Sequence, residues 1–124
     1  MRDILFRGKR SDNGNWIQGS LFVRINDAYL FPLPIATSKA KVDPQTVGQF
    51  TGQIDKIGRK IFEGDILQTE DRLVVVVWND RAGCWDSNFV RYIEKPSWTG
   101  ITYSQWRRWA TIIGNIHDNP ELLE

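Results

Sequence analysis

The chain has 124 residues, 41% of them hydrophobic, and its formal net charge is +1. That length suffices for one domain with its own core, and we expect a single domain over residues 1–124. The hydrophobic content argues against an intrinsically disordered chain. A nearly neutral balance gives no general attraction to nucleic acid or to anionic membranes. A single cysteine, Cys84, excludes an intramolecular disulfide framework.

The charges are unevenly distributed along the chain. Residues 1–62 hold 10 Lys and Arg against 5 Asp and Glu, whereas residues 63–124 hold 6 against 10. We favour the interpretation that the two halves attract each other or are solvated independently. The alternative is that they form complementary surfaces which meet between subunits.

No basic start followed by an apolar run is present, so we expect no secretory signal. The longest apolar run, residues 73–78, is far shorter than the roughly 20 residues of a membrane-spanning helix. We therefore expect a soluble intracellular protein without membrane contact.

Short apolar and β-branched segments separated by turn residues predict strands in the first half of the chain. The predicted strands cover residues 4–6, as an edge strand, then 16–25 and 28–31. Turns are predicted at Asn13-Gly14 and Asn26-Asp27. Gly19 indicates a bulge or a close approach of two backbones. Residues 35–45 are small, polar and basic, and we interpret them as a loop.

The second half continues the pattern, with strands predicted over residues 46–51, 59–62, 66–69, 72–79, 84–93 and 111–117. Gly58 stands where a turn needs positive φ. Four consecutive valines at 74–77 favour a strand that is buried on both faces. Residues 98–109 are ambiguous, because Trp106 and Trp109 would share a helical face while 99–103 alternate as a strand would. Pro120 suits the start of a short C-terminal helical turn over 121–124. The whole predicts a mainly β fold, either a barrel or several short coiled antiparallel sheets.

Four segments resemble the YopX family of phage and prophage proteins. They are RDILFRG at 2–8, VGQFTGQIDKIGRKIFEGDIL at 47–67, VVVW at 75–78 and TIIGNIHDNPELL at 111–123. Two departures are the absence of the aromatic residue that often follows the first segment, and Ile57 in place of the usual asparagine. Residues 16–45 and 79–110 match only loosely. The resemblance implies an SH3-like barrel within the mainly β fold, phage origin and assembly into homo-oligomers. Together with the expected lack of a secretory signal, this origin leads us to expect the cytoplasm of a bacterial host cell. It implies no reaction.

The residues give little support to catalysis. Cys84 and His117 are the one thiol and imidazole that could form a nucleophile–base pair, but no orienting third residue is identifiable. One His and one Cys do not supply the usual four zinc ligands. Glu63, Asp65, Glu70 and Asp71 could gather at a hairpin end, yet we favour turn formation and solvation for them. We expect no catalytic residues, no metal and no cofactor.

Binding has a clearer signal near the end of the chain. Cations and aromatic residues interleave in a segment that suits base stacking with phosphate contacts. The alternatives are two core tryptophans with two solvated arginines, or a protein-binding hot spot. The candidate binding residues are Trp98, Tyr103, Trp106, Arg107, Arg108 and Trp109. We expect a non-enzymatic phage accessory protein that self-assembles and binds a phage or host protein. The alternative is a nucleic-acid-binding accessory factor that uses Arg107 and Arg108.

Overall fold

The structure is a computed structural model, and it describes residues 4–32, 39–93 and 105–124. The prediction of a mainly β fold is confirmed, because the described residues form two antiparallel sheets and, besides these, only short helical turns. The residues group into two compact units, 1–50 and 51–124. Each unit is described by itself, and the expectation of a single domain stays a prediction.

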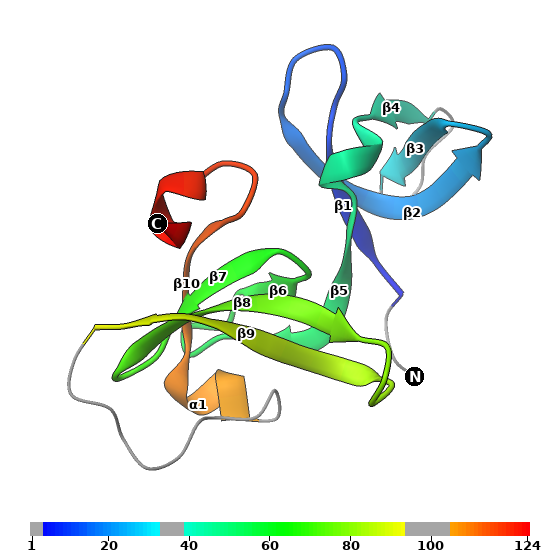
Figure 1. Ribbon diagram of the computed structural model, residues 1–124. Helices are drawn as coiled ribbons and strands as arrows, with labels where there is room; N and C mark the ends of the chain where they lie inside the picture. The colour runs from blue at the N-terminus through cyan, green and yellow to red at the C-terminus, as the bar shows by residue number, and fades with distance from the viewer. Residues whose placement is uncertain (1–3, 33–38, 94–104) are drawn as a thin grey trace. The chain divides into compact units, whose positions relative to one another are not determined.

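The 1–50 unit is built on a sheet with strand order β4-β3-β2-β1-β5 (Figure 1). Its elements are β1 (Phe6–Lys9), β2 (Trp16–Arg24), β3 (Asp27–Pro32), β4 (Ala40–Val42), the 3-10 helix η1 (Pro44–Thr46) and the start of β5 (Gly48–Ile54). One face of this sheet carries a small core of Ala28, Leu30 and Val42, with Phe6, Ile17, Leu21 and Val47 packed against it.

Two predictions for this unit are wrong. The segment expected as an edge strand forms β1, which pairs on both sides, with β2 and with β5. The expected loop at 35–45 contains β4, which pairs with β3 and places Val42 fully in the core. A segment this short shows no pattern of its own, and it becomes a strand because a neighbouring strand offers it a register.

Gly19 makes the predicted close approach. It lies opposite both Phe6 and Pro32, between the two neighbours of β2. A β-carbon at this position would collide with the carbonyl oxygen of Phe31, a backbone atom that a rotamer change cannot move. The absence of a side chain at Gly19 is therefore what lets β3 pack at this point of the sheet.

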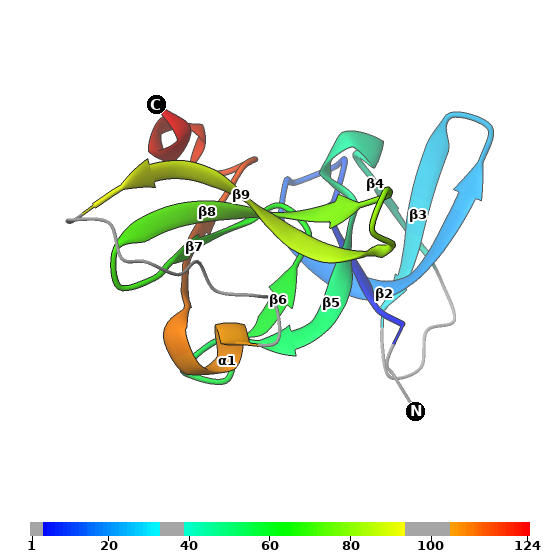
Figure 2. The same ribbon diagram turned by 60° about the horizontal axis from the view of Figure 1, so that its bottom comes forward.

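The 51–124 unit contains the rest of β5 and a sheet with strand order β10-β7-β8-β9 (Figure 2). Its further elements are β6 (Lys60–Phe62), β7 (Asp65–Gln68), β8 (Arg72–Asn79), β9 (Cys84–Tyr92), α1 (Trp106–Trp109), β10 (Thr111–Asn115) and the 3-10 helix η3 (Pro120–Leu123). The predicted bounds of β8 are confirmed, as is the C-terminal helical turn. Over the described residues both sheets have an open strand order, so the SH3-like barrel stays a prediction.

The core of this unit lies between the sheet and α1. It consists of the buried residues Ile61, Leu67, Val74, Val76, Trp85, Trp106 and Ala110. In β8 the side chains of Val74 and Val76 are buried, whereas Val75 and Val77 are only half-buried. The prediction that both faces of this strand are buried is therefore wrong for one face.

A buried carboxylate connects the β5–β6 turn to β10. Asp55 is 1% exposed, and its two oxygens accept hydrogen bonds from the N–H groups of Ile57, Arg59 and Ile112 and from the Arg59 guanidinium. Burial alone would raise the pKa of Asp55, but these donors and the charge of Arg59 hold that pKa below the ordinary aspartate value. The ionised side chain is thus part of the fold.

The turn at Gly58 gives a first prediction. Its φ is +90°, as the sequence indicated, and a β-carbon there would meet nothing within 4 Å. Gly58→Val should therefore cost only backbone strain, about 1–3 kcal/mol of unfolding free energy in urea denaturation. Ile57→Val at the adjacent exposed position is the control and should leave that free energy unchanged. Equal stability of the wild type and Gly58→Val would contradict the turn geometry.

Candidate binding surfaces

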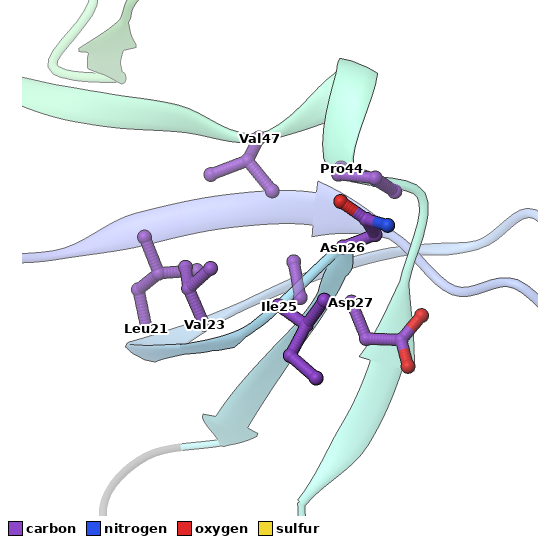
Figure 3. A pocket seen from close by; sticks show the side chains of 8 residues that line it. Leu21, Val23, Ile25, Asn26, Asp27, Pro44 and Val47 are labelled. Carbon is purple, nitrogen blue, oxygen red and sulfur yellow. The ribbon is translucent and has the colours of Figure 1, made fainter.

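An apolar hollow of about 360 Å³ lies within the 1–50 unit. Figure 3 shows Leu21 and Val23 from β2 around it, with Pro44 of η1 and Val47. These side chains lie at the edge of the core of Ala28, Leu30 and Val42, against which Leu21 and Val47 also pack. Val23 remains 61% exposed. The hollow, meaning this cavity and its apolar lining, is a place where a partner's apolar side chain could be buried.

The β2–β3 hairpin loop forms part of the lining of the hollow, and its conformation is one that its sequence does not favour. Arg24 pairs with Asp27, which leaves Ile25 and Asn26 as a two-residue loop. Ile25 has φ +54° and is the one non-glycine residue with positive φ among those described. Two-residue hairpin loops normally place Gly, Asn or Asp at such positions, because a β-branched side chain there is strained.

Ile25 is also 89% exposed. We call Ile25 and Asn26 the tip. The turn predicted from the sequence was Asn26-Asp27, one residue further along the chain, because both of these residue types are common in turns. The tip was therefore not predicted. The signal that could have found it is the apolar residue directly before Asn26, in a hairpin loop without glycine.

The structure divides the binding residues predicted from the sequence. Trp106 is fully buried in the core, whereas Arg107 and Arg108 are exposed and Trp109 is 46% exposed. Residues 106–109 form the helical turn α1, which settles the helix-or-strand question for these four residues. Trp98 and Tyr103, and the alternating segment 99–103, lie outside the described residues. Trp106 is therefore a packing residue, and the exposed part of the patch is Arg107, Arg108 and Trp109.

This remaining α1 patch adjoins a polar cavity of about 320 Å³. The Arg108 guanidinium lies 5.6 Å from the centre of the Trp109 ring, in cation–π range. Trp109 also lines the cavity, together with Lys56 and Glu70. The opposite charges of Lys56 and Glu70 give the cavity no strong preference for an anion.

Two of the acidic residues considered for catalysis, Asp65 and Asp71, are buried and hydrogen-bonded within the chain. Asp65 is 1% exposed and accepts a hydrogen bond of 2.7 Å from the N–H of Phe62, which closes the tight turn before β7. Asp71 accepts two hydrogen bonds, of 2.9 and 3.1 Å, from the Arg72 guanidinium. The hydrogen bond with Asp71 raises the pKa of Arg72. No group of three or more potential metal ligands occurs among the described residues.

Cys84 and His117 belong to different parts of the 51–124 unit. Cys84 is half-buried at the start of β9, where it pairs with Asn79. His117 lies in the turn after β10, and its N–H donates to Asn115 Oδ1. The Asn115 side chain holds this turn together, so the segment around His117 has a structural role. In the part of the chain that the structure describes, no helix has the length and apolar character needed to cross a membrane.

The fold defines a small mainly β protein in which Asp65 and Asp71 are hydrogen-bonded within the chain. Comparison with known proteins gives its family. The model of the family described as YopX protein matches residues 5–124, essentially the whole chain, so the chain belongs to the YopX family.

A solved structure titled as protein EF1440 from Enterococcus faecalis is similar over 100% of both chains, with 23% sequence identity and a TM-score of 0.62. At this identity the likeness concerns the fold alone. No curated protein matches the chain.

Proposed function

We propose that the chain is a non-enzymatic phage or prophage accessory protein that acts by self-assembly and by binding a phage or host protein. The observation that carries the proposal is the strained, exposed tip at Ile25 beside the apolar hollow. Strained backbone persists where surrounding structure enforces it, and it occurs most often at functional sites. In the isolated chain, an apolar side chain that is so exposed contributes little packing energy to offset the strain of its backbone.

The tip and the hollow suit self-assembly because they belong to one patch. In a two-fold dimer the same patch of both subunits meets itself, so a protruding residue of one copy enters the hollow of the other, twice. Ile25 is 89% exposed and forms part of the rim of the hollow, which Leu21, Val23 and Val47 also line. The same patch would serve an apolar side chain of another protein.

Two further features accompany the proposal. The turn-closing hydrogen bond of Asp65 and the hydrogen bonds of Asp71 with Arg72 support a non-enzymatic role, because these are acids that a catalytic site would have used. We also propose, from the family resemblance, that the 51–124 unit is a variant of the SH3-like barrel, a fold that serves many binding functions.

Ile25→Gly tests the proposal, because its two expected effects have opposite signs. Glycine adopts positive φ without strain, so the unfolding free energy of the monomer should rise by about 1 kcal/mol in urea denaturation. The loss of the protruding side chain should weaken self-association on the order of 30-fold, as measured by sedimentation velocity over a range of concentrations.

The control is Ile57→Asn, which removes an isoleucine that is 67% exposed in the other unit. It should leave the self-association of the chain unchanged. A wild type that stays monomeric at every concentration would overturn the self-assembly proposal. An Ile25→Gly variant that is no more stable than the wild type would remove the strain on which the proposal rests.

The second candidate function is nucleic-acid binding by the α1 patch. The observation in its favour is that Arg107 and Arg108 are both exposed and that Arg108 stacks on Trp109. It predicts salt-sensitive binding that weakens when both arginines become alanine. Binding that ignores salt, or its absence, would reject this candidate.

A further inference from the structure

The sheet of the 1–50 unit has a second face, which the core does not cover. Residues directly opposite each other on antiparallel strands point to the same side, and sides alternate along each strand. Since Ile17, Leu21, Ala28 and Leu30 face the core, the registers assign the intervening residues to the other side. We call this other side the open face. It carries the aromatic residues Trp16, Phe22, Tyr29 and Phe31.

Cations interleave with these rings. The open face also carries Arg7, Lys9, Arg24, Lys39 and Lys41, whereas Asp27 is the acid that the registers assign to it. Asp27 lies 3.5 Å from the Lys41 ammonium, and the registers assign more cations than acids to this face. The bias matches the unit as a whole, since residues 1–50 hold 7 Lys and Arg against 4 Asp and Glu.

The rings and the cations are in contact. The Arg7 guanidinium lies 4.8 Å and the Lys9 ammonium 5.6 Å from the centre of the Trp16 ring. The Lys39 ammonium lies 5.2 Å from the centre of the Tyr29 ring. Phe22, which is 45% exposed, lies 6.2 Å from Tyr29 between ring centres. The rings of β2 and β3 thus contact cations on both sides, from β1 and from Lys39 just before β4.

We propose that the open face binds single-stranded nucleic acid without strong sequence preference. Such surfaces combine cations, which contact the phosphates, with rings on which unpaired bases stack. A duplex keeps its bases stacked on each other and would leave the rings unused. An acidic peptide would satisfy the cations but offers few flat groups for four aromatic residues, so the rings favour nucleic acid.

This site differs from both surfaces described above. The hollow is lined by residues of the core-facing side of β2, such as Leu21 and Val23, so it lies on the other side of the sheet. The α1 patch belongs to the other unit. The proposal does not depend on self-assembly, and the two can fail separately.

The test uses the full chain and a fluorescein-labelled oligothymidylate of about 16 nucleotides, the upper end of the site size of comparable β modules. Binding is measured by fluorescence anisotropy, with a duplex of equal length and poly-glutamate as competitors. We expect the single strand to bind more tightly than the duplex. If four phosphates are contacted, affinity should fall on the order of 50-fold between about 50 and 200 mM salt.

Two variants separate the contributions of rings and charges, and both change exposed side chains. Phe22→Ala should weaken binding about fivefold or more with little change in the salt dependence. Arg24→Ala combined with Lys39→Ala should weaken binding and reduce the slope of log affinity against log salt by about 1.4. The matched control, Lys60→Ala with Arg81→Ala, removes two exposed cations of the 51–124 unit that belong to neither surface and should change nothing. Arg107→Ala with Arg108→Ala tests the α1 patch separately.

Three outcomes would overturn the proposal. The first is no binding at the lower salt concentration. The second is a loss confined to the variant with Arg107→Ala and Arg108→Ala, which would place the nucleic-acid site in the α1 patch. The third is equal displacement by duplex and poly-glutamate with no effect of Phe22→Ala, which would indicate a general polyanion surface. Circular dichroism of each variant confirms that a loss of binding does not reflect unfolding.

Discussion

Replacement of Asp55 by asparagine is expected to lower the unfolding free energy of the 51–124 unit by about 2–4 kcal/mol. Four N–H groups converge on the two carboxylate oxygens, at distances of 2.8 to 3.1 Å. An asparagine keeps one acceptor oxygen and turns an NH₂ group towards the remaining donors. Either the pair from Ile57 and Arg59 or the pair from Arg59 and Ile112 then loses its acceptor.

The effect should depend on pH. Because the pKa of Asp55 is lowered in the folded chain, its ionised form stabilises the fold above the ordinary aspartate pKa of 3.8. That stabilisation is lost as the pH falls further, through the lowered pKa of the folded state. The difference between wild type and Asp55→Asn should therefore be constant near neutral pH and shrink in strongly acidic solution. Urea denaturation followed by tryptophan fluorescence at several pH values measures it.

Asp12→Asn is the control for charge alone. Asp12 also pairs with an arginine, Arg10, at 2.7 Å, but the pair lies on the surface of a turn. Exposed ion pairs contribute little to stability, so the unfolding curve should not move. If Asp55→Asn were as harmless as Asp12→Asn, the four hydrogen bonds would not hold β10 to the β5–β6 turn.

The local sequence was sufficient to predict an element where one residue type determines the backbone conformation. Residues 72–79 form β8 with the predicted bounds, since consecutive valines leave little choice of conformation. Gly58 and the turn at Asn13-Gly14 were also predictable, the latter closed by the hydrogen bond from Gly14 N–H to the Arg10 carbonyl. In each case the signal lies within a few residues of its effect.

The features that the sequence did not predict depend on contacts between residues that are far apart along the chain. The turn at Asp55 was foreseen, but its carboxylate reaches Ile112, 57 residues away, and no local pattern encodes that contact. The core position of Trp106 likewise depends on strands elsewhere in the unit. The open face could be recognised only when registers placed Trp16 beside Lys9 and Phe22 beside Tyr29.

Val76→Asp is expected to destabilise the 51–124 unit by about 4 kcal/mol or more, a large part of the stability of a typical domain. Val76 is 1% exposed and belongs to the core formed with Leu67, Trp85 and Trp106. A carboxyl group there replaces packed methyl groups and is surrounded by apolar side chains. Urea denaturation followed by tryptophan fluorescence should show the loss, since Trp85 and Trp106 lie in the same core.

Val23→Asp is the matched control, with the same exchange at a valine that is 61% exposed. It should change the unfolding free energy far less, although it should weaken self-association, because Val23 lines the hollow. Similar unfolding curves for the two variants would contradict the placement of Val76 in the core.

The pH dependence of Val76→Asp should have the opposite sign to that of Asp55. Apolar surroundings disfavour the charged form, so the pKa of the introduced carboxyl rises on folding, and the folded state binds a proton that the unfolded chain has released. The variant should therefore be least destabilised in mild acid and lose stability as the pH rises towards neutrality. Asp55 and Val76 are thus equally buried, but their surroundings favour opposite charge states. The hydrogen-bond donors around Asp55 favour an ionised carboxylate, whereas the methyl groups around Val76 disfavour one.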